Sequence, residues 1–237
     1  MRARLFCLGM LLFLLTSCAA EKPRQLPKFI SEPPQSLHQE QRKVCESVYP
    51  EGRWQFVHSV EFTMADGAGS TVIGVTVLDG NEISCALMTI EGFTLFEARY
   101  TGRLKVIRAV PPFDKPAFAA GLMNDVRAIF VRPAGKDVRY GRLRENPHCC
   151  RIIAADGRVT DIMPSANGCW RINTYNNELI KTRTIVARSC RTADAYRIPG
   201  ELELTVPGPA GYTLKMTLLS AEKIHAAAAA NQKHASR

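Results

Sequence analysis

The sequence has little of what an enzyme of a known class requires. It contains no G-x-S-x-G elbow, no H-E-x-x-H motif, no P-loop and no glycine-rich dinucleotide turn. Its five histidines are dispersed along the chain and no C-x-x-C pair is present, so a zinc site has no support. By their local pattern Asp114, Asp125, Asp156 and Asp161 are turn or helix-surface residues. We therefore expect no enzyme, no catalytic or metal site and no cofactor.

Blocks of one charge are absent as well. The formal net charge is +9, from 31 basic and 22 acidic residues, and the basic residues are scattered without a run of five. They are not interleaved with aromatic side chains as in sites that bind single-stranded nucleic acid. Nucleic acid is therefore not expected as a partner. A mildly basic surface suits anionic lipid headgroups, and it is equally compatible with an ordinary solvated surface.

One apolar stretch lies near the N-terminus, and no other run approaches the length of about 18 residues that a membrane-spanning helix needs. It follows Arg2 and Arg4 and ends in Leu15-Thr16-Ser17-Cys18. This pattern predicts a lipoprotein signal peptide over residues 1–17 and lipidation of Cys18 with diacylglycerol and palmitate-type chains. An ordinary secretory signal that discards Cys18 is the alternative. Many inner-membrane lipoproteins of Gram-negative bacteria carry Asp directly after the lipidated cysteine, whereas Ala19 follows Cys18 here. We therefore expect a lipid anchor on the periplasmic face of the outer membrane.

The composition divides the rest of the chain into three parts. Residues 18–50 form a proline-bearing tether in which only residues 35–48 have the composition of a short helix. Alternation of period two begins at residue 51, so we place the folded domain at residues 51–220. The Ala-rich tail of residues 221–237 is expected to fray.

The folded domain is predicted to be mainly β. Arg53 to Met64 alternates between large apolar and polar side chains, as a half-buried strand does. Turn sequences such as Asp79-Gly80-Asn81 and Asp156-Gly157 separate it from further segments of the same kind. Only Pro116 to Val131 has helical spacing of apolar residues. These patterns predict a mainly β (α+β) fold of about eleven antiparallel strands with one inserted amphipathic helix.

The order of these features resembles the LolA/LolB-like superfamily, and it is most similar to an uncharacterised LolB-like family of bacterial outer-membrane lipoproteins. The resemblance covers roughly residues 51–220. It rests on the lipobox, the tether, the patches Val75-Thr76-Val77-Leu78 and Met88-Thr89-Ile90-Glu91-Gly92-Phe93-Thr94, and the helix after Pro111-Pro112. It implies a half-open antiparallel β-barrel whose helix lies over an apolar concavity. It also implies transport or binding of lipid acyl chains or lipoproteins without enzymatic activity.

A large sheet with one apolar face and a single helix leaves part of that face uncovered, which favours a ligand cavity. His58 lies on this face, either as a core histidine or as a polar anchor inside the cavity. A filled core has the same pattern and would make the chain a structural or assembly lipoprotein with a protein partner. We predict that the cavity is lined by Trp54, Phe56, Phe62, Met64, Leu204, Tyr212, Leu214 and Met216, with Phe118, Leu122 and Met123 as a helical lid.

The resemblance also points to a membrane-facing hairpin loop. In LolB, a leucine directly before a glycine protrudes from the loop after the third strand and helps lipoproteins to enter the membrane. Here Glu91 precedes Gly92, with Ile90 before it. Because a carboxylate resists transfer into lipid, the resemblance supports lipid binding better than it supports insertion of lipoproteins. We predict that Ile90 and Glu91 face the membrane.

Six cysteines follow the lipobox, and an oxidising compartment would allow disulfides among them. A hairpin through Asn176-Asn177 would bring Cys169 and Cys190 to the same end, so we predict that they are bonded. Cys85 lies in an apolar alternation, as a buried free thiol does. The adjacent Cys149 and Cys150 should point to opposite faces of an extended segment.

Overall fold

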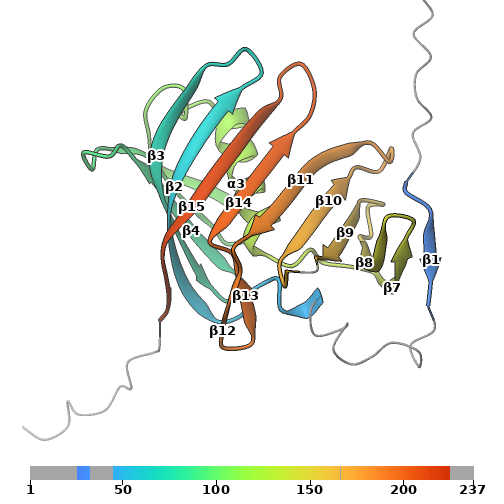
Figure 1. The fold of residues 1–237 in the computed structure, drawn as a ribbon. Helices are drawn as coiled ribbons and strands as arrows, with labels where there is room; N and C mark the ends of the chain where they lie inside the picture. The colour runs from blue at the N-terminus through green and yellow to red at the C-terminus, as the bar shows by residue number, and fades with distance from the viewer. Residues whose placement is uncertain (1–25, 33–44, 166, 225–237) are drawn as a thin grey trace, which may run out of the picture.

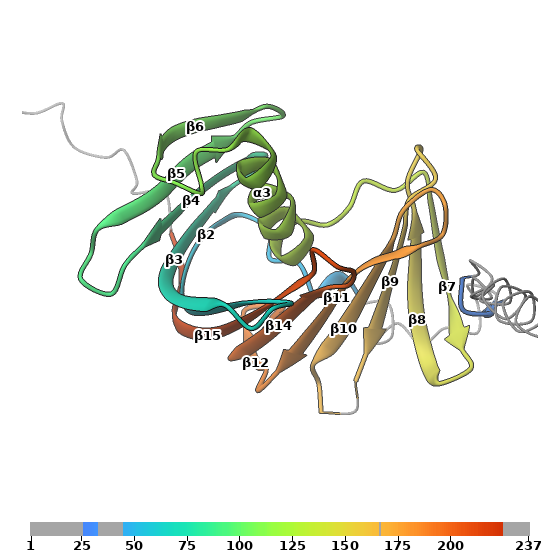
Figure 2. The ribbon, with the colours of Figure 1, turned by 90° about the horizontal axis from the view of Figure 1, so that it is seen from above.

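The computed structural model describes residues 26–32, 45–165 and 167–224. Its main element is an antiparallel sheet of 13 strands that curves around one helix, α3 (Pro116–Phe130). Figures 1 and 2 show α3 inside the curve of the sheet. No helix among the described residues is long and apolar enough to cross a membrane. The predicted signal peptide and the predicted lipidation site, Cys18, lie outside the described residues.

The order of the strands explains how the two halves of the chain meet. The strands β2 to β6 form a meander that runs to one edge of the sheet, and α3 then carries the chain across to the other edge. The strands from β7 onward return inward until β15 pairs with β2. The short strands β12 (Arg191–Ala193) and β13 (Tyr196–Ile198) form a separate hairpin. The spatial order of the main sheet is β1 (Phe29–Ser31), β7 (Asp137–Leu143), β8 (Asn146–Ile153), β9 (Val159–Pro164), β10 (Trp170–Tyr175), β11 (Lys181–Arg188), β14 (Glu201–Val206), β15 (Tyr212–Lys223), β2 (Arg53–Met64), β3 (Gly69–Asp79), β4 (Glu82–Met88), β5 (Thr94–Tyr100) and β6 (Leu104–Ala109).

The described residues form fifteen strands rather than about eleven. The prediction missed β1, β7, β12 and β13. Three of them are only three residues long, which is too short for a periodic pattern. The fourth, β7, has arginines at positions 139 and 142, which fall on opposite faces of a strand, so neither face is apolar throughout.

Two pieces of the predicted tether belong to the fold. In the first piece β1 pairs with β7, where any side chain at position 141 would collide with the carbonyl group of Ile30, so that glycine is required there. The second piece carries a disulfide from Cys45 to Cys150 and the buried side chains of Val48 and Tyr49. At the other end β15 continues to Lys223. The folded part therefore extends beyond residues 51–220 in both directions.

The core lies between the concave face of the sheet and α3. Alternation in β2 turns Trp54, Phe56 and His58 toward the helix, where the rings of Phe56 and Phe130 stack with centroids 5.1 Å apart. The helix begins with a proline, which suits the first turn because a backbone N–H there would have no acceptor within the helix. Each large apolar side chain buried here contributes about 1.5–3 kcal/mol. This packing places α3 over the predicted ligand cavity.

Candidate ligand-binding concavity

The structure brings the predicted wall residues together on one face of three neighbouring strands. Across β15 and β2, Tyr212 pairs with Met64 and Leu214 with Phe62. Across β14 and β15, Leu204 pairs with Leu214. Since alternate residues of a strand share a face, the wall residues of all three strands face α3. The apolar face of each strand was predictable from its alternation, whereas the pairing of the three strands was not.

Burial separates these residues into a deep group and a rim. Trp54, Phe56, Leu204 and Met216 are buried beneath α3 and belong to the core. Phe62, Tyr212 and Leu214 are half-buried, and Met64 is 37% exposed. The rings of Phe62 and Tyr212 are 5.4 Å apart. The deep group is therefore covered by α3, while the rim of the same apolar face remains in contact with solvent.

The predicted lid residues lie along α3 at different depths. Met123 is buried against the sheet, whereas Phe118 and Leu122 are half-buried. Phe118 packs edge-on against Phe113, with ring centroids 5.2 Å apart. Phe130, which was not among the predicted lid residues, stacks on the ring of Phe56. Residues from the first turn to the last turn of α3 therefore contribute to the packing, and the helix covers the deep part of the concave face.

A buried polar contact attaches α3 to the sheet. Arg183 Nε on β11 donates to Asp125 Oδ1 over 2.6 Å, and the Tyr212 hydroxyl donates to the other oxygen of the same carboxylate. Burial raises the pKa of Asp125, while Arg183 and the hydrogen bond from Tyr212 act in the opposite direction. The desolvation of the carboxylate thus outweighs the attraction of its partners. We call Asp125, Arg183 and Tyr212 the helix contact.

The local pattern of the sequence predicts Asp125 on the helix surface, and this prediction is wrong. Asp125 is buried, at 4% exposure. Its position three residues after Leu122 and four before Ile129 puts it in the apolar stripe of α3. This spacing was a signal in the sequence that Asp125 is buried. Asp161 is likewise fully buried in β9, where both of its oxygens accept hydrogen bonds from Arg151.

His58 is part of the packed core. Its ring lies among the rings of Phe56 and Phe130, and its Nε2 forms no hydrogen bond. Burial lowers its pKa to about 4, so the side chain is neutral at neutral pH. A neutral imidazole enclosed by aromatic rings contributes packing to the concavity and no charge.

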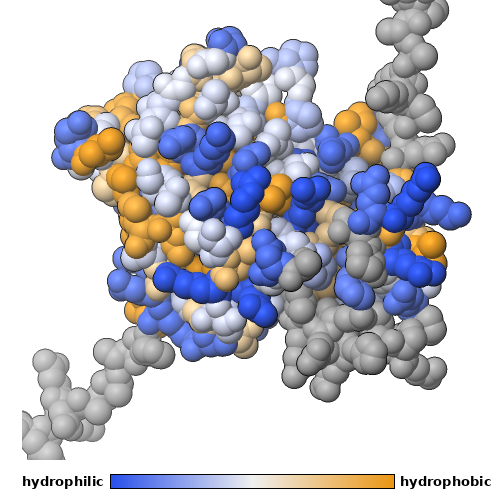
Figure 3. Space-filling model, in the orientation of Figure 1, coloured by the Kyte–Doolittle hydropathy of each residue, from blue (hydrophilic) through white to orange (hydrophobic). Residues whose placement is uncertain are grey.

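The hairpin between β4 and β5 exposes two apolar side chains. Ile90 is 72% exposed and Phe93 is 60% exposed, with Glu91 and Gly92 between them. Figure 3 shows hydrophobic and hydrophilic residues side by side where this hairpin projects from the molecule. The backbone of Thr89 bonds to that of Phe93, and the turn needs the positive φ of 90° at Gly92. Hydrogen bonds from its own backbone amide and from Thr89 lower the pKa of Glu91. The tip therefore presents a charged carboxylate between two apolar groups.

The structure contains two disulfides. Cys169 is bonded to Cys190 at the end of the β10–β11 hairpin, the pairing that the hairpin predicts. Cys45 is bonded to Cys150, and Cys85 and Cys149 are buried free thiols. Cys150 packs in the main core, whereas Cys149 packs in a second cluster on the opposite face of the sheet. Among the residues that the structure describes, no group of three or more acidic, cysteine or histidine side chains could hold a metal ion.

Among the comparisons with known proteins, one with a solved structure bears on the fold. No family model and no curated protein sequence matches the chain. A LolA superfamily protein from Nitrosomonas europaea is similar in structure, with a TM-score of 0.53 and 11% identity over 79% of this chain and 93% of that one. A domain named for outer membrane lipoprotein sorting, from Vibrio parahaemolyticus, reaches a TM-score of 0.43 at 9% identity, over 77% of this chain and 90% of that one. The similarity to the first structure confirms the predicted LolA-like fold.

Proposed function

We propose that this chain is a non-enzymatic lipoprotein that holds the acyl chain of a lipid or of a lipoprotein in its apolar concavity. The observation that carries the proposal is the incomplete cover of the concave face. One helix covers the deep residues, and the rim residues Phe62, Met64 and Leu214 stay partly exposed beside it. An acyl chain laid along this rim would remove apolar surface from water.

The helix contact is suited to reversible opening. An acyl chain that enters beneath α3 must displace the helix from the sheet, and Asp125 is the polar group that joins the helix to β11 and β15. Because burial raises the pKa of Asp125 despite Arg183, the ion pair is stabilised little beyond the loss of hydration. Opening would return both charges to water, so the hydration they regain would offset the loss of the ion pair.

Displacement of a fluorescent fatty acid tests the acyl-chain site. The chain from residue 19 onward, with its disulfides intact, keeps every described residue. We expect saturable binding that Met64→Trp weakens about tenfold, because the indole ring would fill the rim. Leu219→Trp is the matched control, since Leu219 is 56% exposed at an irregularity of β15, seven residues along the strand from Tyr212, the partner of Met64. If the unaltered protein binds no probe, or if both variants bind equally well, the acyl-chain proposal is wrong.

We place the protein on the periplasmic face of the outer membrane, anchored through Cys18, with Ile90 and Phe93 of the β4–β5 hairpin turned toward the lipid. Their exposure supports a membrane contact, and the charge on Glu91 keeps the tip at the headgroup level. Cys18→Ser should abolish incorporation of radiolabelled palmitate. Palmitate found on the Cys18→Ser protein would contradict the anchor.

A second candidate function is an assembly lipoprotein that binds a protein partner. The convex face of the sheet supports it, because Val57, Val75 and Ala86 lie side by side across β2, β3 and β4 and are only half-buried. Mass spectrometry of the protein purified from its native membrane separates the two candidates. A lipid that copurifies supports the carrier, and a stoichiometric protein without lipid supports the assembly role.

A further inference from the structure

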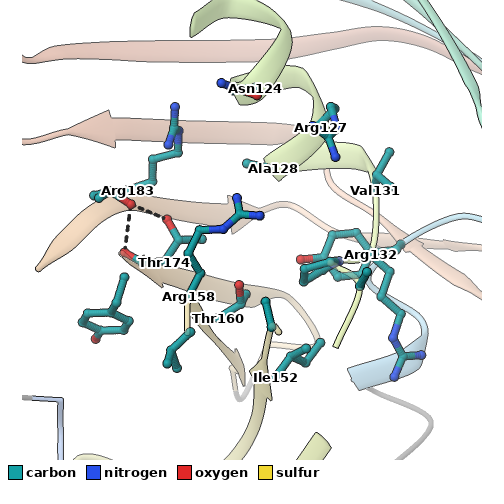
Figure 4. A pocket seen from close by; sticks show the side chains of 17 residues that line it. Asn124, Arg127, Ala128, Val131, Arg132, Ile152, Arg158, Thr160, Thr174 and Arg183 are labelled. Atoms are coloured by element: carbon teal, nitrogen blue, oxygen red, sulfur yellow. Dashed lines mark hydrogen bonds between the residues drawn. The ribbon is translucent and has the colours of Figure 1, made fainter. Parts of the chain in front are cut away.

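A cavity of about 390 Å³ lies between the C-terminal half of α3 and strands β8 to β11, away from the rim residues of the apolar concavity. Four arginines line it: Arg127 in α3, Arg132 just after the helix, Arg158 before β9 and Arg183 in β11. No aspartate or glutamate is among the lining residues. Figure 4 shows Arg158 rising from the sheet toward the last turns of α3, where Arg127 lies.

The charges around this arginine cavity do not balance. Arg183 is paired with Asp125, and Arg158 is paired with Asp156 over 2.8 Å. Within the described ranges neither Arg127 nor Arg132 forms an ion pair. Four arginines less two carboxylates leave a net charge of +2. The C-terminal end of α3 adds only about half a negative charge, so the cavity stays positive.

The donors of the cavity are partly fixed in place. The guanidinium of Arg127 lies 4.4 Å from the centroid of the Tyr100 ring, which holds it by a cation–π contact. The hydroxyls of Thr174 and Thr182 bond to each other at one side of the cavity, 3.1 Å apart. Planar guanidinium groups bind oxyanions through two parallel N–H donors, and recessed positive surfaces concentrate anions.

We infer that the arginine cavity binds a phosphate monoester, either as a free metabolite or as the headgroup of a lipid. A phosphate monoester carries close to two negative charges at neutral pH, which matches the net charge of the cavity. The volume falls within the range of about 300–1,000 Å³ that is usual for small-molecule sites, so an organic substituent fits beside the phosphate. This inference does not rest on the proposed acyl-chain site, because the two sets of lining residues share no member and meet only at the helix contact, to which Arg183 belongs.

Calorimetric titration of the chain from residue 19 onward with glycerol 3-phosphate tests the inference. We expect saturable binding that weakens as salt is added, and none with glycerol. Arg127→Gln and Arg158→Gln should each weaken binding about tenfold or more, since each removes a charge-assisted hydrogen bond. Arg158 is the safer variant for folding because its side chain is 68% exposed.

Arg171→Gln is the matched control. Arg171 is exposed on the opposite face of β10, so this variant changes the net charge equally and should alter the dissociation constant by less than twofold. Equal weakening by Arg171→Gln and Arg158→Gln would show unspecific attraction and overturn the inference.

Dihexanoylphosphatidic acid distinguishes the two sources of the phosphate. Binding at least tenfold tighter than that of glycerol 3-phosphate, with the same loss in Arg127→Gln, would identify a lipid headgroup. Equal affinity of the two probes would identify a free phosphate ester. Failure of both probes to bind would overturn the inference and would leave the fatty-acid result unaffected.

Discussion

The two halves of the sheet bury their surfaces by different means. In the half formed by β14, β15 and β2 to β5, the concave face is apolar, and Phe56, Phe96 and Leu204 are fully buried beneath α3. In the half formed by β7 to β11, Ile162, Ile172 and Ile185 of the concave face belong to the same core, while threonines and Arg183 of that face surround the arginine cavity. One half thus presents an apolar face, and the other combines a core with a polar recess.

The opposite, convex face of the β7–β11 half also buries charged side chains. Arg151 and Asp161 form a buried pair there with two hydrogen bonds of 2.7 Å. The segment before β1 covers the pair, since Arg151 also donates to the carbonyl group of Pro27 and its guanidinium lies over the ring of Phe29. The N-terminal segment around β1 therefore covers the convex face of the β7–β11 half, and it encloses a buried ion pair there.

The largest effect should come from detaching the N-terminal segment from the β7–β11 half. Removing the Cys45–Cys150 disulfide by Cys45→Ser and Cys150→Ser should lower the free energy of unfolding by about 4–5 kcal/mol, because the bond joins residues 105 apart. Urea denaturation without reductant measures it. The Cys169–Cys190 pair, 21 residues apart, should cost about 3 kcal/mol. A smaller effect for the longer separation would contradict this reasoning.

Arg151→Leu should destabilise the protein by about 3–4 kcal/mol, because it leaves Asp161 charged and buried without its partner. Replacing both residues by leucine should restore most of that stability in the same urea experiment. Arg188→Leu is the control, since the pair of Arg188 and Glu203 is partly exposed and should contribute less than about 1 kcal/mol. A double variant as unstable as Arg151→Leu would show that the pair itself stabilises the fold.

Acid should weaken the apolar half through His58. The pKa of His58 is about 4 in the folded protein and 6.5 in the unfolded chain, so the unfolded state binds more protons between these values. Stability is therefore lost as pH falls from 6.5 toward 4, by about 3 kcal/mol. His58→Leu should remove this part of the pH dependence, measured as urea midpoints from pH 7 to 4. Parallel pH profiles for the two proteins would mean that His58 is not buried in the neutral form.

The smallest effects should separate the deep and rim positions of the apolar half. Met216→Trp should cost about 1–3 kcal/mol, since Met216 is buried and its surroundings are packed. Met64→Trp should change stability by less than about 0.5 kcal/mol, because Met64 is partly exposed at the rim. Thermal unfolding of both variants provides the measurement. Similar losses at both positions would show that the rim is as filled as the deep group.

Local patterns predicted most of the apolar half. The alternation of Trp54, Phe56 and His58 identified β2 and its buried face, and apolar residues at intervals of three and four identified α3. These patterns work because the buried face of an element repeats with the period of that element. The β7–β11 half was harder to predict, since neither face of β7 is apolar throughout and the charged Asp161 is buried through its pairing with Arg151.

The sequence by itself determined the mainly β class, the helix α3, the hairpin that joins Cys169 to Cys190 and the face of β2 that is buried, because each follows from the residues of one short segment. Only the tertiary structure decided which segments meet. It brought β15 beside β2, bonded Cys45 to Cys150 and gathered four arginines from separate elements around one cavity. Such contacts join residues far apart in the chain, and their free energy depends on the burial and pairing that the whole fold provides.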